Sequence, residues 1–216
     1  MTDADLRSPP ITVVAPHPDD EVFGVGGIMR ELVARGRTLR IIAVSDGEAA
    51  YGDADPGARR ALVVRRADER ARALADLGVF EQTEVVRLGL PDGHLADHAT
   101  MLTERLHELA GPVLLATWRH DGHPDHEAVG RAAAAVARQR HLRLIEYVVW
   151  APHRQRIDHR TGGRLRTIEL SPPTLAAKGR AVAAFRSQID PSPDGHPVVS
   201  TDLVERLGHG HELVFT

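Results

Sequence analysis

The sequence predicts an α/β fold in a single domain. Two observations carry this prediction: short apolar runs alternate with longer stretches of helical periodicity, and each apolar run is nearly continuous rather than alternating in polarity. Strands separated by helix-length connections form parallel βαβ units, and continuous apolar strands are typical of a sheet that helices cover on both faces. We therefore expect a Rossmann-like, three-layer, doubly wound sheet that is mostly parallel.

The apolar runs and the helical patterns alternate along most of the chain. Strands are expected at Ile11–Ala15, Leu39–Val44, Glu84–Leu88, Val113–Ala116 and Arg143–Val149. Helices are expected at Val25–Arg35, Ala58–Leu77, Thr100–Leu109 and Glu127–Arg138. Gly36 and Gly78 directly follow the first two helices and are expected to end them, as glycine commonly does.

The pattern is less regular after the fifth predicted strand. The chain is polar from Pro152 to Leu170, where Thr161-Gly162-Gly163 indicates a hairpin or a loop. A last helix is expected at Pro173–Arg186, and the chain closes on a short apolar run at Leu213–Phe215. Neither a repeat nor a domain boundary is evident from residue 11 onward.

Length and composition exclude several classes of protein. We assign residues 1–10 to an N-terminal tail and residues 11–216 to one domain. The formal net charge is −3 and the basic residues are scattered among acids, so no nucleic-acid partner is expected. There is no cysteine, so a metal ion would have to bind through His, Asp or Glu. No signal sequence and no membrane span is recognisable, so we expect a cytoplasmic protein.

Imidazole and carboxylate groups follow two of the predicted strands. The motif PHPDDE at residues 16–21 comes directly after the first strand, and GHPDH at residues 122–126 comes shortly after the fourth. Proline disfavours the helical conformation of the residue before it, so His17 and His123 should both be extended. Open α/β sheets bind ligands at the carboxyl ends of their strands, and we expect the two motifs to meet there.

Together the two motifs hold the groups that a catalytic zinc ion requires. His17 and Asp20 from the first motif and His126 from the second supply three ligands, which leaves open positions for water. Zinc lowers the pKa of such a water to about 7, so that it can attack an amide carbonyl once a base takes its proton. Adjacent carboxylates rarely point the same way, so one of Asp19 and Asp20 can bind the metal while the other stays free. We expect one Zn²⁺ ion per chain.

Two plainer interpretations compete with a metal centre. A single His-Pro-Asp would indicate only a turn, but two copies at strand ends that complete a ligand set favour a metal. The glycines at positions 24, 26 and 27 could belong to a dinucleotide-binding loop, but Met29 occupies the place of the third glycine in G-x-G-x-x-G. These glycines are expected instead to let the first helix pack closely beneath the metal.

These residues resemble the LmbE-like (PIG-L) family of zinc-dependent N-deacetylases, from about Ile11 to Gln188. Besides the two motifs, the resemblance includes SDGE at 45–48, R-x-x-E at 66–69 with LG at 77–78, LGLPDG at 88–93, residues 146–150, and Ser187-Gln188. It implies a metal-dependent hydrolase that removes an N-acetyl or other acyl group from a small amino-sugar or glycoconjugate substrate. Because relatives frequently associate, it also implies a possible homo-oligomer.

The resemblance implies a role for each matching residue. It assigns zinc to the same three ligands and makes Asp19 the general base. His123 would stabilise the oxyanion or protonate the leaving amine, and Asp125 would orient that neighbouring imidazole. Whether Asp19 or His123 protonates the amine is left open. Arg66 and Asp92 match positions that commonly contact sugar hydroxyls.

Structural roles compete with some of these assignments. Arg66 belongs to a helix rich in Arg and Glu, where ion pairing on a solvated face is an alternative to ligand contact. Asp92 also fits a plain turn, since it stands between a proline and a glycine. Tyr147 and Trp150 are expected in the core rather than as sugar platforms. Some relatives carry a tyrosine before the second motif, and residues 118–121 contain none. Any extra donor to the oxyanion would therefore have to come from His123 or His120.

Two other functions stay open at this point. One is a metal-dependent hydrolase of another class, such as a phosphoesterase, although ligands for a second metal are not evident beside the first set. The other is a catalytically idle relative that serves as a binding module. The presence of both Asp19 and His123 disfavours it, because such a relative would be expected to lose the base first.

Overall fold

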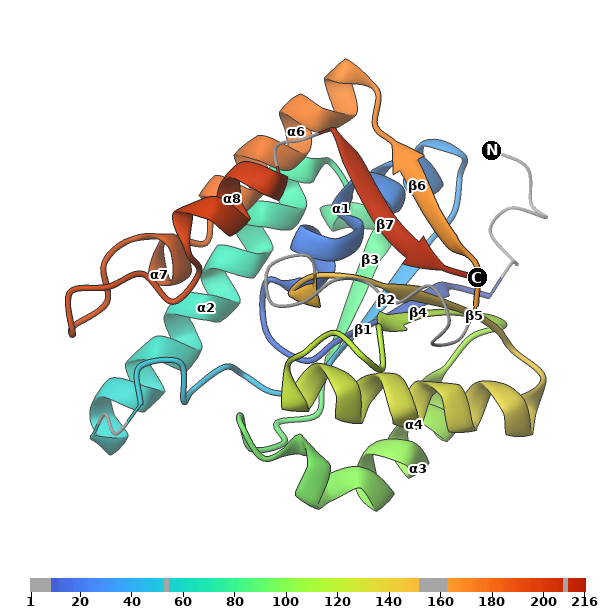
Figure 1. The fold of residues 1–216 in the computed structure, drawn as a ribbon, viewed down its shortest axis with the longest axis horizontal. Helices are drawn as coiled ribbons and strands as arrows, with labels where there is room; N and C mark the ends of the chain where they lie inside the picture. Colours follow the sequence, from blue (N-terminus) through green and yellow to red (C-terminus); the bar gives the residue numbers. More distant parts are fainter. Residues whose placement is uncertain (1–8, 53–54, 152–162, 208–209) are drawn as a thin grey trace.

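The computed structural model describes residues 9–52, 55–151, 163–207 and 210–216. In these residues a seven-stranded sheet with the order β3-β2-β1-β4-β5-β7-β6 lies between layers of helices (Figure 1). Its strands are β1 (Ile11–Ala15), β2 (Leu39–Ala43), β3 (Thr83–Arg87), β4 (Val113–Thr117), β5 (Arg143–Tyr147), β6 (Leu165–Glu169) and β7 (His211–Phe215). The first five are parallel, and β7 runs antiparallel to β5 and β6. The predicted three-layer, mostly parallel sheet is confirmed.

Helices cover both faces of the sheet. One layer holds α1 (Asp20–Ala34), α2 (Pro56–Leu77), α6 (Pro172–Ala183) and α8 (Thr201–Leu207), and the other holds α3 (Ala99–Leu109) and α4 (Pro124–Arg140) (Figure 1). Shorter elements are α7 (Arg186–Ile189) and the 3-10 turns η2 (Phe80–Gln82) and η3 (Leu95–His98). Among the described helices, none combines the length and the apolar character that crossing a bilayer demands.

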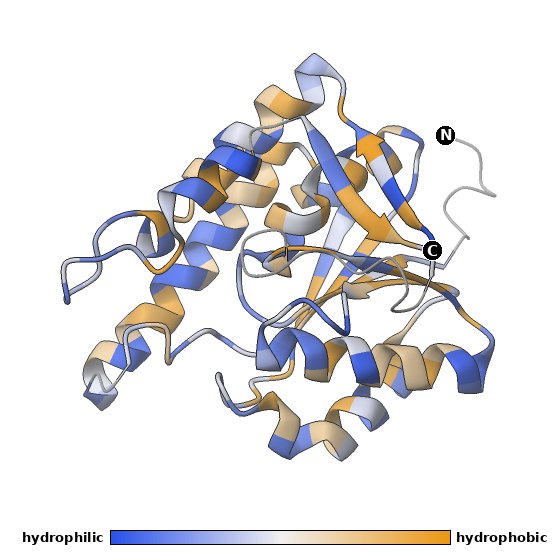
Figure 2. Cartoon of the chain, in the orientation of Figure 1, coloured by the Kyte–Doolittle hydropathy of each residue, from blue (hydrophilic) through white to orange (hydrophobic). Residues whose placement is uncertain are grey.

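Neighbouring residues of one strand face opposite helical layers. Val13 of β1 and Ile41 of β2 pack in the core under α1, α2 and α6, whereas Val14 and Ile42 pack in the core under α3 and α4. All four side chains are fully buried, and full burial of such a side chain is worth about 1.5–3 kcal/mol. This two-sided burial explains the continuous apolar strands, which are largely hydrophobic in Figure 2 while the helices are mixed.

Strands β1 and β4 are neighbours in the sheet although β2 and β3 separate them in the sequence. The chain builds the sheet in one direction from β1 to β3, then returns and builds in the other direction from β4. The helices that follow β1 and β4, α1 and α4, therefore lie on opposite faces. This arrangement opens a crevice at the carboxyl ends of the two strands, which is where doubly wound sheets bind their ligands.

Helix α1 begins at Asp20, five residues before the predicted start, and is interrupted at Val25, whose φ and ψ are −138° and 21°. The interruption frees the backbone N–H groups of Gly27 and Ile28, and both donate to the carboxylate of Glu212, at 2.7 and 2.9 Å. The ammonium of Lys178 in turn donates to Glu212 at 2.6 Å. A buried ion pair from two distant segments therefore caps the second half of α1.

The expectation that the glycines of this helix permit close packing is confirmed. A β-carbon on Gly24 would lie 2.2 Å from a ring carbon of Tyr147, and one on Gly27 would lie 2.4 Å from the side chain of Leu170. Gly78 ends α2 in the left-handed conformation, with φ of 78°, as predicted.

The end of the chain is more regular than the sequence predicted. The polar stretch before Leu170 contains strand β6, which the prediction missed, and the apolar end belongs to a longer strand, β7. Helix α6 stops at Ala183, so the expected Pro173–Arg186 helix is divided between α6 and the separate α7. Positions 161 and 162 of the predicted hairpin lie outside the described residues, as do residues 1–8 of the proposed tail.

Candidate metal centre and active site

The two sequence motifs meet at the crevice between β1 and β4. Strand β1 ends at Ala15, and its motif turns directly into α1, which begins at Asp20. After β4, the second motif enters α4, with His123 at the N-cap and His126 in the first turn. His123 is extended, with φ and ψ of −116° and 127°, as its following proline predicted. Residues about a hundred positions apart thereby form one site.

The three expected zinc ligands surround a common point. The Oδ2 atom of Asp20 lies 3.1 Å from Nδ1 of His17 and 3.2 Å from Nε2 of His126. The candidate ligand atoms of these residues all lie within 4.8 Å of one another. The backbone N–H of His17 also donates to the same oxygen of Asp20 at 2.9 Å, which fixes the carboxylate in place.

The outer nitrogen of each imidazole is held by carboxylates. Nε2 of His17 lies 3.1 Å from Asp125 and 3.1 Å from Asp92, and Nδ1 of His126 lies 2.8 Å from Asp121. Metal-binding histidines are usually held in this way, because a proton fixed on the outer nitrogen leaves the inner lone pair for the metal. The inner nitrogen of His126 is buried and, among the described residues, receives no hydrogen bond, although Oδ2 of Asp20 lies 3.2 Å away. This donor set fits a zinc ion.

The electrostatics of the cluster also favour a cation at this point. Burial opposes a charge on His126, but the carboxylates of Asp20 and Asp121 outweigh it and raise the pKa of the imidazole to about 9. Burial likewise opposes the charge of Asp20, yet the neighbouring His126 and His17 hold the pKa of this carboxyl well below its usual range. A site that keeps its acid ionised while attracting positive charge is suited to a divalent metal.

Asp19 is separate from the three ligands. Its Oδ2 accepts a hydrogen bond from Nη2 of Arg66 at 3.1 Å, and the side chain lines the same pocket as the cluster. Burial raises the pKa of Asp19 to about 6, against the opposing charge of Arg66. A carboxylate with a pKa near the working pH, and not committed to the metal, is suited to accept a proton.

His123 lies beside the two ligand imidazoles. Its ring centroid is 5.0 Å from that of His17 and 4.8 Å from that of His126. Its Nδ1 accepts from the backbone N–H of Asp125 at 3.3 Å, so the neutral ring carries its proton on Nε2. Burial, with the nearby imidazoles, lowers the pKa of His123 to about 4. The neutral ring can therefore donate a hydrogen bond from Nε2.

Asp125 was expected to orient His123, and its backbone N–H does donate to that ring, but its carboxylate is directed elsewhere. Its carboxylate contacts Nε2 of His17 and accepts from the backbone N–H groups of Gly93 and Leu95, at 2.8 and 3.1 Å. The reason is helical geometry: Asp125 is the second residue of α4, and its side chain turns toward the loop after β3. The carboxylate of Asp125 thus supports His17, an expected metal ligand, while its backbone N–H supports the neighbouring histidine.

Arg66 and Asp92 both lie in the pocket. Arg66 is only 2% exposed, so the alternative that it forms an ion pair on a solvent-exposed face of its helix is wrong. Besides Asp19 it donates to the carbonyl of Gly47 at 3.0 Å. Asp92 contacts His17 and accepts from the backbone N–H of Ala49 at 3.0 Å. Each residue therefore braces a member of the site, and a direct contact with sugar hydroxyls stays a prediction.

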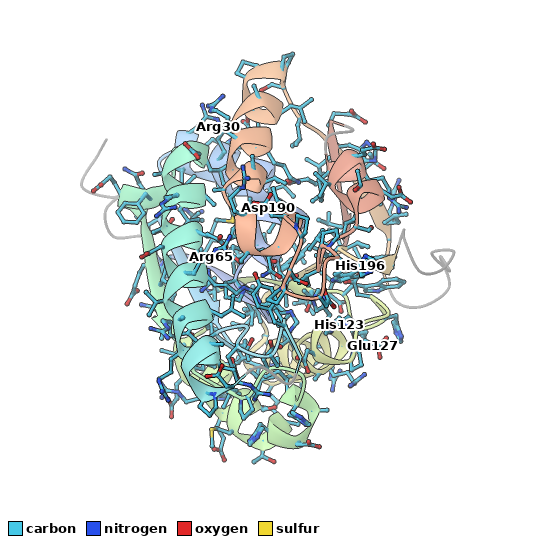
Figure 3. The ribbon with its side chains drawn as sticks, turned by 90° about the vertical axis from the view of Figure 1, so that its left-hand side faces the viewer. Arg30, Arg65, His123, Glu127, Asp190 and His196 are labelled. Carbon is cyan, nitrogen blue, oxygen red and sulfur yellow. The ribbon has the colours of Figure 1, made fainter. Side chains whose placement is uncertain are left out.

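The open pocket above the cluster has a cavity volume of about 100 Å³ and a mixed lining. Charged and amide side chains share it with the apolar groups of Phe23, Trp150, Val198 and Val199. Trp150 was expected in the core; its half-buried side chain packs against the core and also lines the pocket, with its ring 6.3 Å from that of His123. The core position expected for Tyr147 is confirmed, since the side chain is fully buried and its hydroxyl donates to a β1 carbonyl. Figure 3 shows His123 at the start of α4, with His196 of the segment after α7 above it.

Comparison with known proteins assigns the chain to a family. Residues 12–137 match the family described as PIG-L, GlcNAc-PI de-N-acetylase. The chain belongs to this family. Its predicted resemblance to the LmbE-like (PIG-L) deacetylases is confirmed.

Two curated relatives of this PIG-L member carry deacetylase names. The "Probable N-acetyl-alpha-D-glucosaminyl L-malate deacetylase 2" of Bacillus subtilis is 28% identical over 130 residues. The diacetylchitobiose deacetylase of Thermococcus kodakarensis is 29% identical over 126 residues. Each match covers 56% of this chain, but only 58% and 46% of the respective relatives.

Solved structures share the fold over most of the chain. The conserved protein TT1542 of Thermus thermophilus is 28% identical and superimposes with a TM-score of 0.63. The match covers 91% of this chain and 84% of that one. The fold likeness therefore extends beyond the segment that the family match covers.

In this PIG-L member Asp121 was given no role in the site by the sequence, and Glu69, Ser187 and Gln188 were named without a role. Asp121, fully buried, holds His126 from behind. Glu69 accepts from the backbone N–H and hydroxyl of Ser187, which fixes Gln188 in the pocket wall. The sequence offered a signal for each: an Asp just before the second motif, and the Arg-x-x-Glu spacing, which places Arg66 and Glu69 on one side of α2.

Proposed function

We propose that this chain is a zinc-dependent N-deacetylase. It would remove an acetyl or related acyl group from the nitrogen of a small amino-sugar or glycoconjugate substrate. The observation that carries the proposal is a complete ligand set, His17, Asp20 and His126, next to the uncommitted carboxylate of Asp19. The deacetylase names of its curated relatives support the same chemistry.

The ligands and their neighbours define a division of labour. A zinc ion bound by the three ligands would acidify a water molecule and polarise the acyl carbonyl. Asp19 would take the proton from that water, and Arg66 holds its carboxylate in position. His123, neutral and protonated on Nε2, would donate a hydrogen bond to the oxygen that becomes negative. Asp19, which then carries the proton taken from the water, would return it to the departing amine; His123 could do so only after it had itself been protonated.

The same cluster supports one metal ion per chain. A second group of candidate ligands consists of His17, His123 and Asp125, and it shares His17 with the first group. Two ions would therefore have to compete for one imidazole. This sharing disfavours a phosphoesterase that works with two metals, each with its own ligands.

The mixed lining of the pocket supports an amino-sugar substrate. Arg66, Asp92 and Gln188 offer donors and acceptors for hydroxyl groups. Trp150 and Val199 offer apolar surface, and a sugar ring has both a hydroxyl-rich edge and an apolar face. The partner is thus a small molecule, and no nucleic acid is proposed. A homo-oligomer and a cytoplasmic location stay predictions from the sequence.

The test combines metal analysis with acetate release. We expect about one zinc per chain, and acetate release from N-acetylglucosamine, diacetylchitobiose or an N-acetylglucosaminyl glycoside. Asp19→Asn should keep the zinc and lose about 10²- to 10⁴-fold in turnover, the usual contribution of a general base. Hydrolysis of a phosphate monoester instead of the amides would contradict the proposal. Zinc binding without turnover of any amide or ester would favour the idle binding module.

A further inference from the structure

Asp121 occupies an unusual position behind the site. The residue is fully buried in the segment between β4 and α4. Its carboxylate accepts from Nδ1 of His126 at 2.8 Å. It also accepts from the backbone N–H groups of three consecutive residues: Val149 at 3.1 Å, Trp150 at 3.0 and 3.1 Å, and Ala151 at 3.0 Å. One carboxylate thus binds both the second motif and the loop after β5.

The contact with His126 determines which nitrogen faces the ligand cluster. An ionised carboxylate only accepts hydrogen bonds, so the imidazole must present N–H at Nδ1. In the neutral ring, which is the form that binds a metal, Nε2 then carries the lone pair, and it lies 3.2 Å from Oδ2 of Asp20. Asp121 is the carboxylate that accepts from Nδ1 of His126. Without it, the imidazole of His126 could carry its proton on either nitrogen.

The contacts with the loop determine where the apolar wall stands. Trp150 lines the pocket, and its backbone N–H donates to both oxygens of Asp121. The flanking amides of Val149 and Ala151 donate to the same side chain. Residues 149–151 therefore cannot move away from the site without leaving a buried carboxylate short of donors, which is costly for a charged group.

We propose that Asp121 is a positioning residue that sets the metal-binding nitrogen of His126 and, through the same carboxylate, the place of Trp150 in the pocket wall. The inference rests on the proposed metal centre. In this proposal Asp121 touches neither the metal nor the substrate. It connects His126, which would bind the metal, to Trp150, which would face the substrate.

The variant Asp121→Asn separates this role from simple filling of space. Asparagine has the same shape, and its oxygen can still accept from the loop amides, but its NH₂ group would face the N–H at Nδ1 of His126. Two donors cannot pair, so the ring would change to the tautomer with a proton on Nε2. That nitrogen could not bind zinc without further rearrangement. Loss of such a supporting carboxylate typically weakens metal affinity by about 10- to 100-fold.

Glu146→Gln is the matched control. Glu146 is also a buried carboxylate, and it accepts from the guanidinium of Arg119, two residues before Asp121. No histidine is recorded among its hydrogen-bond partners in the described part of the chain. This variant should therefore lose an ion pair in the same region while its zinc affinity stays that of the unaltered chain.

The experiment measures zinc affinity by competition with a chromophoric chelator, and thermal unfolding of the zinc-free proteins. We expect a loss of affinity of about 10- to 100-fold for Asp121→Asn and none for Glu146→Gln. The zinc-free Asp121→Asn protein should remain folded. Equal zinc affinity in Asp121→Asn and in the unaltered chain would overturn the inference. Absence of zinc binding to the unaltered chain would instead overturn the proposed metal centre.

A measurement on the unaltered chain covers the case in which the variant does not fold. In the zinc-loaded protein, long-range ¹H–¹⁵N correlations should find the His126 proton on Nδ1 and slow exchange of that proton, because Asp121 encloses it. A proton on Nε2, with coordination through Nδ1, would refute the role assigned to Asp121.

Discussion

Replacement of Lys178 tests how helix α1, which begins in the site, is held in place, because Lys178 pairs with the carboxylate that caps the second half of this helix. Its side chain is 1% exposed, and its ammonium donates to Glu212 at 2.6 Å and to the carbonyl of Phe23 at 2.8 Å. Lys178→Met keeps the length and the apolar stem but leaves the carboxylate of Glu212 buried without its cation. Breaking a buried pair in this way costs about 3–5 kcal/mol. That loss would be a large part of the roughly 5–15 kcal/mol by which ordinary domains are stable.

The assay is urea-induced unfolding of the zinc-free protein, with Arg186→Met as the control. Arg186 also pairs with a carboxylate, that of Asp190 at 2.6 Å, but both groups are exposed to solvent. An exposed pair is worth about 0.2–1 kcal/mol. The double variant Lys178→Met/Glu212→Gln should recover part of the lost stability, because the uncompensated charge is gone. The reasoning is refuted if Lys178→Met costs no more than the control, or if the double variant is less stable than the single one.

Three further predictions address the pocket and the helix beneath it. Arg66→Met should retain zinc but lower kcat, because the guanidinium that holds Asp19 is lost. Metal analysis and steady-state kinetics check this prediction, and an unchanged kcat would contradict it. Trp150→Ala should raise KM for sugar substrates more than it lowers kcat, as steady-state kinetics on a glycoside would report. Gly24→Ala should cost about 1–3 kcal/mol, because its β-carbon would overlap Tyr147. Gly179→Ala, in an open position on α6, should instead stabilise the chain by about 0.5–1 kcal/mol; denaturant unfolding compares the two.

The centre of the sheet could be predicted because its residues are buried on both sides. Such strands, β1, β2 and β4, read as continuous apolar runs and were placed within a few residues. Strand β3 lies at one edge of the sheet and is mostly exposed, but the Val85-Val86 pair within it was enough to place it. Strand β6 could not be found in this way. It lies at the edge of the sheet, pairs only with β7 among the described strands, and is mostly exposed, so its polar sequence resembles a loop. The early start of α1 was missed because its glycines suggested a turn.

The site could be predicted as a set of residues but not as a set of contacts. Two His-Pro-Asp motifs at strand ends are enough to bring His17, Asp20 and His126 together. Which carboxylate faces which imidazole depends on side-chain direction at the start of a helix, and so the contact of the Asp125 carboxylate with His17 was not predicted. The burial of Arg66 was not evident either, because its partners are a backbone carbonyl and Asp19, both far away in the sequence.

The crevice between β1 and β4 links metal uptake to folding. One side of it is formed at residue 17 and the other only at residue 126, so the unfolded chain contains no preformed site. A ligand that binds only the native state adds stability by mass action, about 2.7 kcal/mol when its free concentration is a hundred times its dissociation constant. The chain should therefore melt at a temperature that depends on the supply of zinc. In a cell, metal limitation would then reduce the amount of this protein as well as its activity.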